Sequence, residues 1–172
     1  DTILTPIKCS ISRFKKYCNK GYDYILGQYA FGAKPKNEFI KAVDFTANSM
    51  GISAIYVEKD YWVTYALFTI FNSAIGKDTV FKGGTALSKC YNVIERFSED
   101  IDLVVLRRAD ETDSRLKTKL KAISSVVEAV LPEIAVEGIT QKMGMNRKTA
   151  HSYTKEFSGD YGQIRDAIIV EA

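Results

Sequence analysis

The sequence is poor in the residues on which several common kinds of site depend. It contains three cysteines, three prolines, one tryptophan and one histidine among 172 residues. The cysteines, Cys9, Cys18 and Cys90, form neither a CxxC pair nor an evident disulfide framework. His151 is the only histidine, and we expect it to lie in a strand. Nothing in the sequence resembles a Ser-His-Asp triad or a zinc site.

A long hydrophobic run is also missing. The longest uncharged stretch, 61–76, has 16 residues and includes two threonines, an asparagine and a serine. A membrane-spanning helix needs about 20 apolar residues, so this stretch predicts a buried helix instead. Because no signal peptide is visible, we expect a cytoplasmic protein that makes no membrane contact.

Charge is present but unevenly distributed. The formal net charge is +3, and residues 1–50 hold eight Lys/Arg against four Asp/Glu. This basic bias is compatible with nucleic-acid binding. Basic and aromatic residues occur together over 13–24 and could contact RNA, but an amphipathic helix explains the same pattern and is favoured.

Helical periodicity followed by a break divides the chain into two parts. Apolar residues recur every three or four positions over 7–29, after the helix-starting pair Thr5-Pro6. Gly32 and Pro35 then interrupt regular structure. We therefore expect an N-terminal helical extension over residues 1–36 and a second domain over residues 37–172.

The second part predicts an α/β (α+β) domain, in which helices flank a small mixed β-sheet. Helices are expected over about 37–49, 53–75 and 113–131, with N-caps at Asn37, Ser53 and either Asp113 or Ser114. Gly51 suits the end of the first helix. The second helix is apolar on nearly all sides in its latter half, so we expect it to be the central packing element.

Strands are predicted between and after these helices, over 79–82, 100–106, 134–140, 151–157 and 166–171. Both faces of the strand are apolar over 103–106. We therefore expect helices to cover both faces of the sheet.

Two glycines stand between the strand at 79–82 and a further predicted helix. Gly83 and Gly84 lack a Cβ and allow the backbone to turn sharply there, and Thr85 can serve as the N-cap. The expected inner face of this helix consists of Ala86, Leu87, Cys90, Tyr91 and Ile94. A helix N-terminus flanked by Lys82 and Lys89 favours phosphate binding. The alternative is a capped helix without a ligand.

Two carboxylates follow at alternating positions of a strand. Period-two geometry places Asp100 and Asp102 on one face, where they repel each other and lose hydration beside the core. A divalent cation relieves both costs, and Mg²⁺ prefers such oxygen ligands. Neutralisation by Arg96, Lys82 or Lys89 is the alternative. The preceding glycine turn and helix favour the metal interpretation.

A third carboxylate usually helps to hold a second metal ion. Glu171 ends the last predicted strand and could lie beside Asp102, although a surface glutamate is an open alternative. Asp166 and Glu156 are weaker candidates. Together these parts predict nucleotidyl transfer, in which Mg²⁺ ions activate a hydroxyl and stabilise departing pyrophosphate.

Three segments carry a resemblance to a known family. KGGTALSK (82–89), RFSEDIDL (96–103) and the upstream VEKDYWVTYAL (57–67) resemble the nucleotidyltransferase AbiEii/AbiGii toxin family of the DNA polymerase β-like superfamily. The similarity is close over about 37–106 and looser in the tail. It implies a polymerase β-like fold and an Mg²⁺-dependent enzyme that uses an NTP. Such an enzyme is often the toxin of a toxin–antitoxin or phage-defence pair, and some relatives modify RNA, including tRNA acceptor ends.

The resemblance also assigns residues by position. It matches Gly83, Gly84, Thr85, Ser88 and Lys89 to the phosphate-binding motif and Ser98, Asp100 and Asp102 to the metal motif. With Lys82 added for its charge, we expect nucleotide binding at Lys82, Gly83, Gly84, Thr85, Ser88, Lys89 and Ser98, catalysis at Asp100, Asp102 and Lys89, and metal binding at Asp100 and Asp102. Glu171 is added as the expected third ligand. The KDYW segment matches too, but the role of Lys59 and Asp60 stays open. The family normally continues into a helical C-terminal part, so the alternative to a transferase is a nucleotide-binding or protein-interaction module without turnover.

Overall fold

The computed structural model describes residues 36–91, 97–159 and 164–172, with Tyr91 described by its backbone alone. Its longer helices are α3 (Lys36–Met50), α4 (Ala54–Asn72) and α6 (Asp113–Glu128). A 3-10 turn, η1 (Ala74–Asp78), follows α4, and the short helix α5 (Gly83–Ala86) continues into a π-helical turn, η2 (Leu87–Tyr91). The N-terminal helix predicted over 5–29 lies outside the described residues.

The strands form one mixed sheet. They are β1 (Thr79–Lys82), β2 (Ile101–Val105), β3 (Glu133–Ile134), β4 (Lys148–His151) and β5 (Ile168–Glu171), in the order β1-β2-β5-β4-β3. Only β2 and β5 are parallel, and the other pairs are antiparallel. The prediction of an α/β domain with a small mixed sheet is therefore confirmed.

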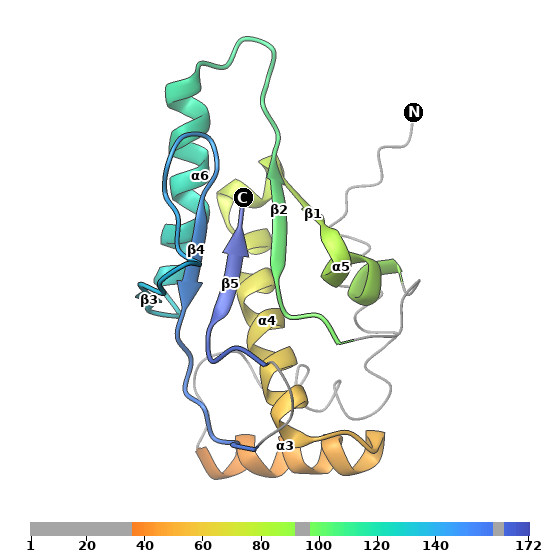
Figure 1. Cartoon of the computed structure of the whole chain (residues 1–172). Helices are drawn as coiled ribbons and strands as arrows, with labels where there is room; N and C mark the ends of the chain where they lie inside the picture. The colour runs from red at the N-terminus through yellow and green to blue at the C-terminus, as the bar shows by residue number, and fades with distance from the viewer. Residues whose placement is uncertain (1–35, 92–96, 160–163) are drawn as a thin grey trace.

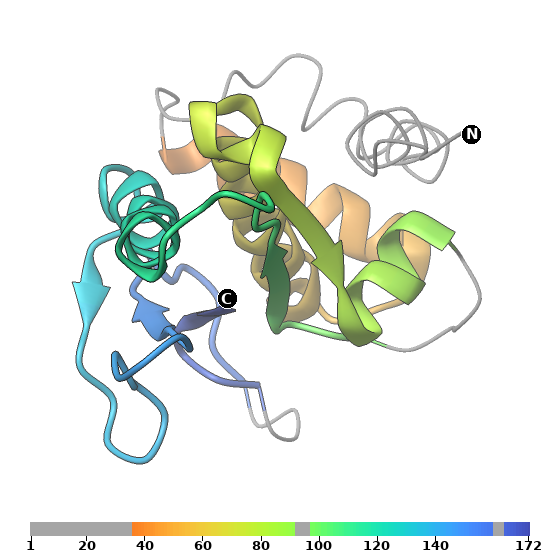
Figure 2. The same ribbon diagram turned by 90° about the horizontal axis from the view of Figure 1, so that it is seen from above.

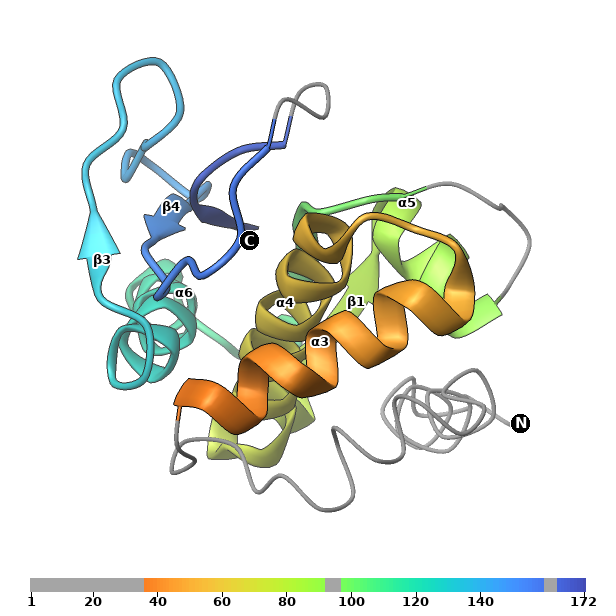
Figure 3. The ribbon, with the colours of Figure 1, turned by 90° about the horizontal axis from the view of Figure 1, so that it is seen from below.

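Helix α4 is the central packing element, as predicted. Its residues Val63, Leu67 and Ile70 pack in one core with inward residues of β2 and β5. Helix α3 crosses α4 at the lower end of the molecule (Figures 1 and 3), while α6 lies next to β3 and β4 and α5 next to β1 (Figure 2). The side chains that pack β2 and β5 onto these helices are Ile101, Leu103, Ile168 and Val170.

The opposite face of β2 is not covered by any described helix. Along β2, Ile101 and Leu103 are buried, whereas Val104 is 42% exposed and Leu106, just beyond the strand, is 48% exposed. The prediction of helices on both faces was therefore wrong. The apolar residues misled it because a sheet face can carry single exposed aliphatic side chains without being a core face.

Two of the predicted caps differ from the structure. Asn37 lies inside α3, which already begins at Lys36, and Thr112 rather than Asp113 or Ser114 caps α6, accepting from the Arg115 N–H. Ser53 occupies the N-cap of α4, although its side chain makes no capping bond. Gly51 ends α3 as predicted, with φ of +67° and the Ile52 N–H bonded to the Ala47 carbonyl.

Two strand predictions in the tail were wrong. Residues 135–140 form a turn held by Thr140, and the pairing of β4 stops at His151. The backbone beyond β4 finds another acceptor, because the N–H groups of Glu156 and Phe157 donate to the buried Glu58 carboxylate at 2.7 and 3.2 Å. In the part of the chain that the structure describes, no helix is long and apolar enough to cross a membrane.

Candidate nucleotide and metal site

Three residues of the candidate site lie side by side across adjacent strands. Antiparallel pairing of β1 and β2 places Lys82 opposite Asp102, and parallel pairing of β2 and β5 places Asp102 opposite Glu171. The neighbours Ile101, Leu103 and Val170 point to the helices. Alternation therefore directs the side chains of Asp102 and Glu171 to the face away from α4 (Figure 1).

Gly83 connects this row to the helix that follows. Its φ is +77°, a left-handed conformation, and a Cβ at this position would overlap the carboxylate of Asp102. The sharp turn predicted at the glycines is therefore present. Both the backbone conformation and the closeness of Asp102 require a residue without a side chain.

Thr85 does not cap the helix as predicted. Lys82 occupies the N-cap, so Gly83 and Gly84 are the first helical residues, whose N–H groups lack partners within the helix. Thr85 is fully buried, and its hydroxyl donates to the Asp100 carbonyl at 2.5 Å and lies 2.7 Å from the Ser98 hydroxyl. Thr85 thus ties α5 to the segment that enters β2.

The inner face of this helix was predicted only in part. Ala86 and Cys90 are buried, but Leu87 is 43% exposed. The helix changes from α to π hydrogen bonding at Leu87, and this wider turn shifts the faces away from a 3.6-residue period. The Tyr91 side chain and Ile94 lie outside the described part.

Asp100 is neutralised by a residue that the sequence did not indicate. The Arg165 guanidinium lies 2.6 Å from the Asp100 carboxylate, and the Arg165 backbone N–H donates to the Glu99 carboxylate. Of the cations predicted for this role, Arg96 lies outside the described residues, and within the described part no ion pair joins Asp100 to Lys82 or Lys89. Arg165 is 65 positions away in the sequence, so no local pattern pointed to it.

Lys59 is the most buried charged residue near the site. Its ammonium group donates to the carbonyls of Arg165 and Ala167, each at 2.6 Å, and lies 3.4 Å from the Glu99 carboxylate. Burial lowers the pKa of Lys59, while Glu99 opposes that shift. Lys59 therefore holds together the segments that lead into β2 and β5.

The next residue reaches the other half of the site. Asp60 forms an ion pair with Lys89 of η2. Lys59 and Asp60 of α4 thus connect to the strands and to the helix of the site, respectively. The sequence had left the role of these two residues open. Three consecutive charged residues, Glu58, Lys59 and Asp60, in an otherwise uncharged helix were the available signal, because buried charges are nearly always paired. Ser88, beside Lys89, is half-buried on η2.

Negative charge gathers around Asp102. Burial raises the pKa of its carboxyl group, and the charges of Glu171 and Asp100 raise it further, whereas Lys82 lowers it. Lys148 of β4 pairs with Glu171 at 2.9 Å. The site therefore has three carboxylates, each near a basic side chain of the protein.

The donor set suits a hard divalent cation. The Asp102 and Glu171 carboxylates lie on one sheet face, and their negative charges repel each other. Carboxylate oxygens are the ligands that Mg²⁺ prefers, and a bound cation would relieve this repulsion. As the side chains stand, no three Asp, Glu, His or Cys residues among those described are gathered as a metal centre. The Asp100 carboxylate is paired with Arg165 instead. The weaker candidates pair elsewhere, Glu156 with Lys36 and Asp166 with Lys155.

Comparison with known proteins identifies the family of the chain. A family model described as nucleotidyl transferase AbiEii toxin, type IV TA system, matches residues 65–172. The match runs through the tail, where we expected only a loose resemblance, and it begins after Lys59 and Asp60. No curated protein and no solved structure matches the chain. Since the family model covers more than half of the sequence, the chain belongs to the AbiEii family of nucleotidyltransferase toxins of type IV toxin–antitoxin systems.

Proposed function

We propose that this protein transfers a nucleotide from an NTP to an RNA acceptor such as a tRNA, in an Mg²⁺-dependent reaction in the cytoplasm. It would act as the toxin of a pair with a cognate antitoxin, in a role such as phage defence. The observation that carries the proposal is the register of Lys82, Asp102 and Glu171, directly before the first N–H groups of α5.

The triphosphate would bind where α5 begins. Backbone N–H groups of Gly83 and Gly84 are donors suited to phosphate oxygens, and the exposed Lys82 adds positive charge. Lys89 would reach the triphosphate after leaving Asp60. The bonds from Thr85 to Ser98 and Asp100 fix the distance between the phosphate end and the carboxylates, which favours catalysis by positioning.

The carboxylates would hold the metal. Asp102 and Glu171 share one sheet face, and Asp100 would join them after releasing Arg165. Bound Mg²⁺ supplies neutralisation of phosphate charge and a lower pKa for an attacking hydroxyl. No covalent intermediate on the protein is required.

The test is transfer of labelled nucleotide from each NTP to total RNA, with and without Mg²⁺. Asp102→Ala and Asp100→Ala should abolish transfer while leaving the fold intact. Asp44→Ala is the matched control, because Asp44 is exposed on α3, a helix that contributes no residue to the site. Unchanged transfer by either site variant would refute the assignment.

Calorimetry separates this function from the alternative of a module without turnover. A transferase should bind an NTP more tightly with Mg²⁺ and also transfer it. Nucleotide binding without transfer to any RNA would favour the binding module.

A further inference from the structure

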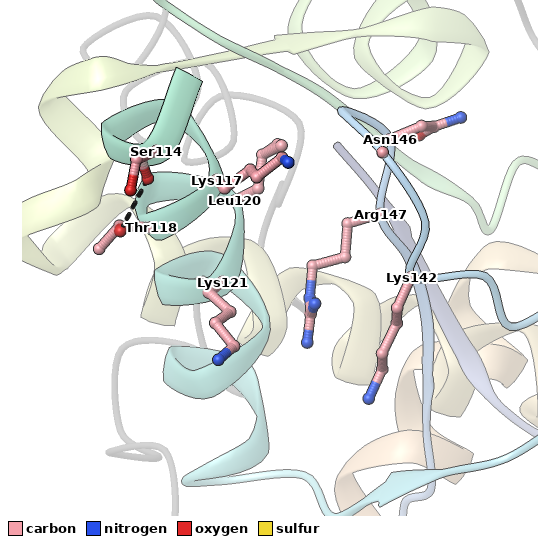
Figure 4. Close-up of a pocket in the computed structure, with 9 residues that line it drawn as sticks. Ser114, Lys117, Thr118, Leu120, Lys121, Lys142, Asn146 and Arg147 are labelled. Atoms are coloured by element: carbon pink, nitrogen blue, oxygen red, sulfur yellow. Dashed lines mark hydrogen bonds between the residues drawn. The ribbon is translucent and has the colours of Figure 1, made fainter. Parts of the chain in front are cut away.

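A second cluster of charge lies outside the candidate site, between α6 and the loop before β4. A cleft of about 330 Å³ opens there (Figure 4). One helix face contributes Ser114, Lys117, Thr118 and Lys121, whose spacing of three or four residues places them in a row. The loop contributes Lys142, Gly144, Asn146 and Arg147, and Leu120 adds the one aliphatic side chain.

The lining is cationic and largely uncompensated. Figure 4 shows the Arg147 side chain extending from the loop into the space beside α6, with Lys142 next to it and Lys117 and Lys121 on the helix. Lys142 pairs with Glu133, and the Arg147 Nε donates to the neutral Ser124 hydroxyl at 2.8 Å. Within the described residues, Lys117 and Lys121 have no ion-pair partner, and no acidic side chain lines the cleft.

This arrangement costs the free protein energy. Lys117 and Lys121 are separated by one helical turn, and like charges at that spacing repel. An anionic ligand would relieve that repulsion, so the cleft is complementary to negative charge.

The composition of the lining indicates phosphates rather than bases. No aromatic ring lines the cleft, and proteins that grip nucleobases usually stack them on aromatic side chains. Lysine, arginine, serine and asparagine are the residues that contact phosphate oxygens and sugars. A free nucleotide would find little apolar surface for its base here.

The cleft also adjoins the end of the strand that carries Glu171. Arg147 exchanges both backbone hydrogen bonds with Ala172, each at 2.9 Å, and the next residue, Lys148, pairs with Glu171. The consecutive basic residues Arg147 and Lys148 therefore face the cleft and Glu171, respectively, on the two sides of this sheet edge. A nucleic-acid strand whose phosphates lie in the cleft would pass around this edge to reach the proposed reaction centre.

We propose that the cleft between α6 and residues 142–147 binds backbone phosphates of the acceptor nucleic acid, an inference that rests on the proposed transfer function. The contact positions the acceptor and does not read its sequence.

The experiment compares two charge-matched double variants. Lys117→Gln with Lys121→Gln removes two cations from the cleft, and Lys41→Gln with Lys77→Gln removes two exposed cations elsewhere. All four residues are exposed, so both variants should fold, and circular dichroism checks this. Fluorescence anisotropy then measures binding of a labelled single strand of about 20 nucleotides, longer than the ~4–16 of a typical single-strand site.

The cleft variant should bind RNA roughly tenfold more weakly at about 0.1 M salt. Its slope of log affinity against log salt should be shallower by about 1.4, at about 0.7 per lost phosphate contact. The control variant should match the wild type. Equal RNA affinity and equal slope for both variants would overturn the proposal.

Two further arms identify the source of the phosphate. DNA of the same sequence should lose affinity in parallel with RNA, because the backbone phosphates are shared. The affinity for NTP should stay unchanged in the cleft variant. A loss of NTP affinity without a loss of RNA affinity would show a free-nucleotide site and overturn the proposal.

The readout is binding, so it is independent of turnover. Asp102→Ala should retain the RNA affinity of the wild type. If no acceptor is modified but RNA binding still depends on Lys117 and Lys121, the proposed transfer fails while the cleft assignment stands.

Discussion

Asp102 is the residue at which charge and burial conflict most directly. It lies between Lys82 and Glu171, and burial together with nearby carboxylates raises its pKa. A carboxyl group whose folded-state pKa exceeds its unfolded value destabilises the fold when ionised. This cost is absent below the unfolded pKa of 3.8 and grows as the pH rises through the folded value.

Asp102→Asn should therefore stabilise the fold while removing function. We expect an increase of about 2 °C in the melting temperature at pH 7 and a smaller one at pH 4, with transfer abolished. Thermal unfolding by circular dichroism at both pH values measures this. A lower melting temperature at pH 7 than the wild type would contradict the electrostatic explanation.

Lys59 shows the reverse case, a buried charge that the fold needs. Lys59→Met keeps the length of the side chain but leaves two carbonyls and Glu99 without the ammonium group. Breaking such a buried pair should lower the free energy of unfolding by about 3–5 kcal/mol. Urea unfolding measures it, with Lys41→Met on the exposed side of α3 as the control.

The control should change stability by less than about 0.5 kcal/mol. If Lys59→Met also lowers the free energy of unfolding by less than about 0.5 kcal/mol, the placement of β5 does not depend on the hydrogen bonds from Lys59 to the two carbonyls.

At the scale of elements, strand β1 passes directly into helix α5 without a connecting loop. Lys82 ends β1 opposite Asp102 and at the same time caps α5. The left-handed Gly83 makes this possible in the space of one residue. Thr85 then fixes the helix to the entry of β2, so the phosphate end and the carboxylates cannot move independently.

A comparison of two glycines isolates this geometry. Gly51 and Gly83 both have positive φ, but a Cβ at Gly51 would meet nothing within 4 Å, whereas at Gly83 it would overlap Asp102. Gly51→Ala should lower stability by about 1–2 kcal/mol through backbone strain and leave transfer intact. Gly83→Ala should be more destabilising and should abolish transfer.

Urea unfolding and the transfer assay, run on both variants, measure these effects. Wild-type transfer by Gly83→Ala would show that the close approach to Asp102 is not needed for the reaction.

At the scale of the whole molecule, the sheet is joined to the last helical segment through a buried histidine. His151 of β4 lies 3.0 Å from the Leu131 carbonyl through Nδ1 and 3.0 Å from the Thr149 hydroxyl through Nε2. A carbonyl only accepts, so Nδ1 carries a proton. Burial lowers the pKa of His151 below 6.5, which favours the neutral ring, and in that ring Nε2 accepts from the Thr149 hydroxyl.

This pKa shift links stability to pH. Above about 6.5 the ring is neutral in both states and its contribution is complete. As the pH falls below that value, the unfolded chain binds a proton that the folded chain does not, so stability is lost. One proton difference limits this loss to about 1.4 kcal/mol per pH unit.

Chemical unfolding between pH 7.5 and 5.5 measures this loss, and His151→Gln should remove it from the profile. Subtracting the two profiles also removes contributions of other groups, including Glu133, Glu128 and Lys142 near the ring. Parallel profiles for the two proteins would contradict the assignment.

Much of this protein followed from local sequence patterns. The uncharged run predicted the central helix α4, the bounds of β1 agreed with the prediction, and the glycines predicted the turn at Gly83. These features depend on side-chain periodicity and backbone freedom within a few residues, which the sequence displays directly. The choice of Asp100, Asp102 and Glu171 as candidate ligands came from the same strand periodicity and stays a prediction.

Only the tertiary structure decided how these parts are held. Lys59 bonds to carbonyls 106 and 108 positions away, and Arg165 reaches Asp100 across 65 positions. The pairing of Asp102 with Glu171 and the cationic cleft likewise join segments distant in sequence. Periodicity determines which face of an element is apolar, but the chain connectivity and the packing of the core determine which distant charges meet. The sequence by itself therefore indicated the chemistry of the site, and the fold selected its partners.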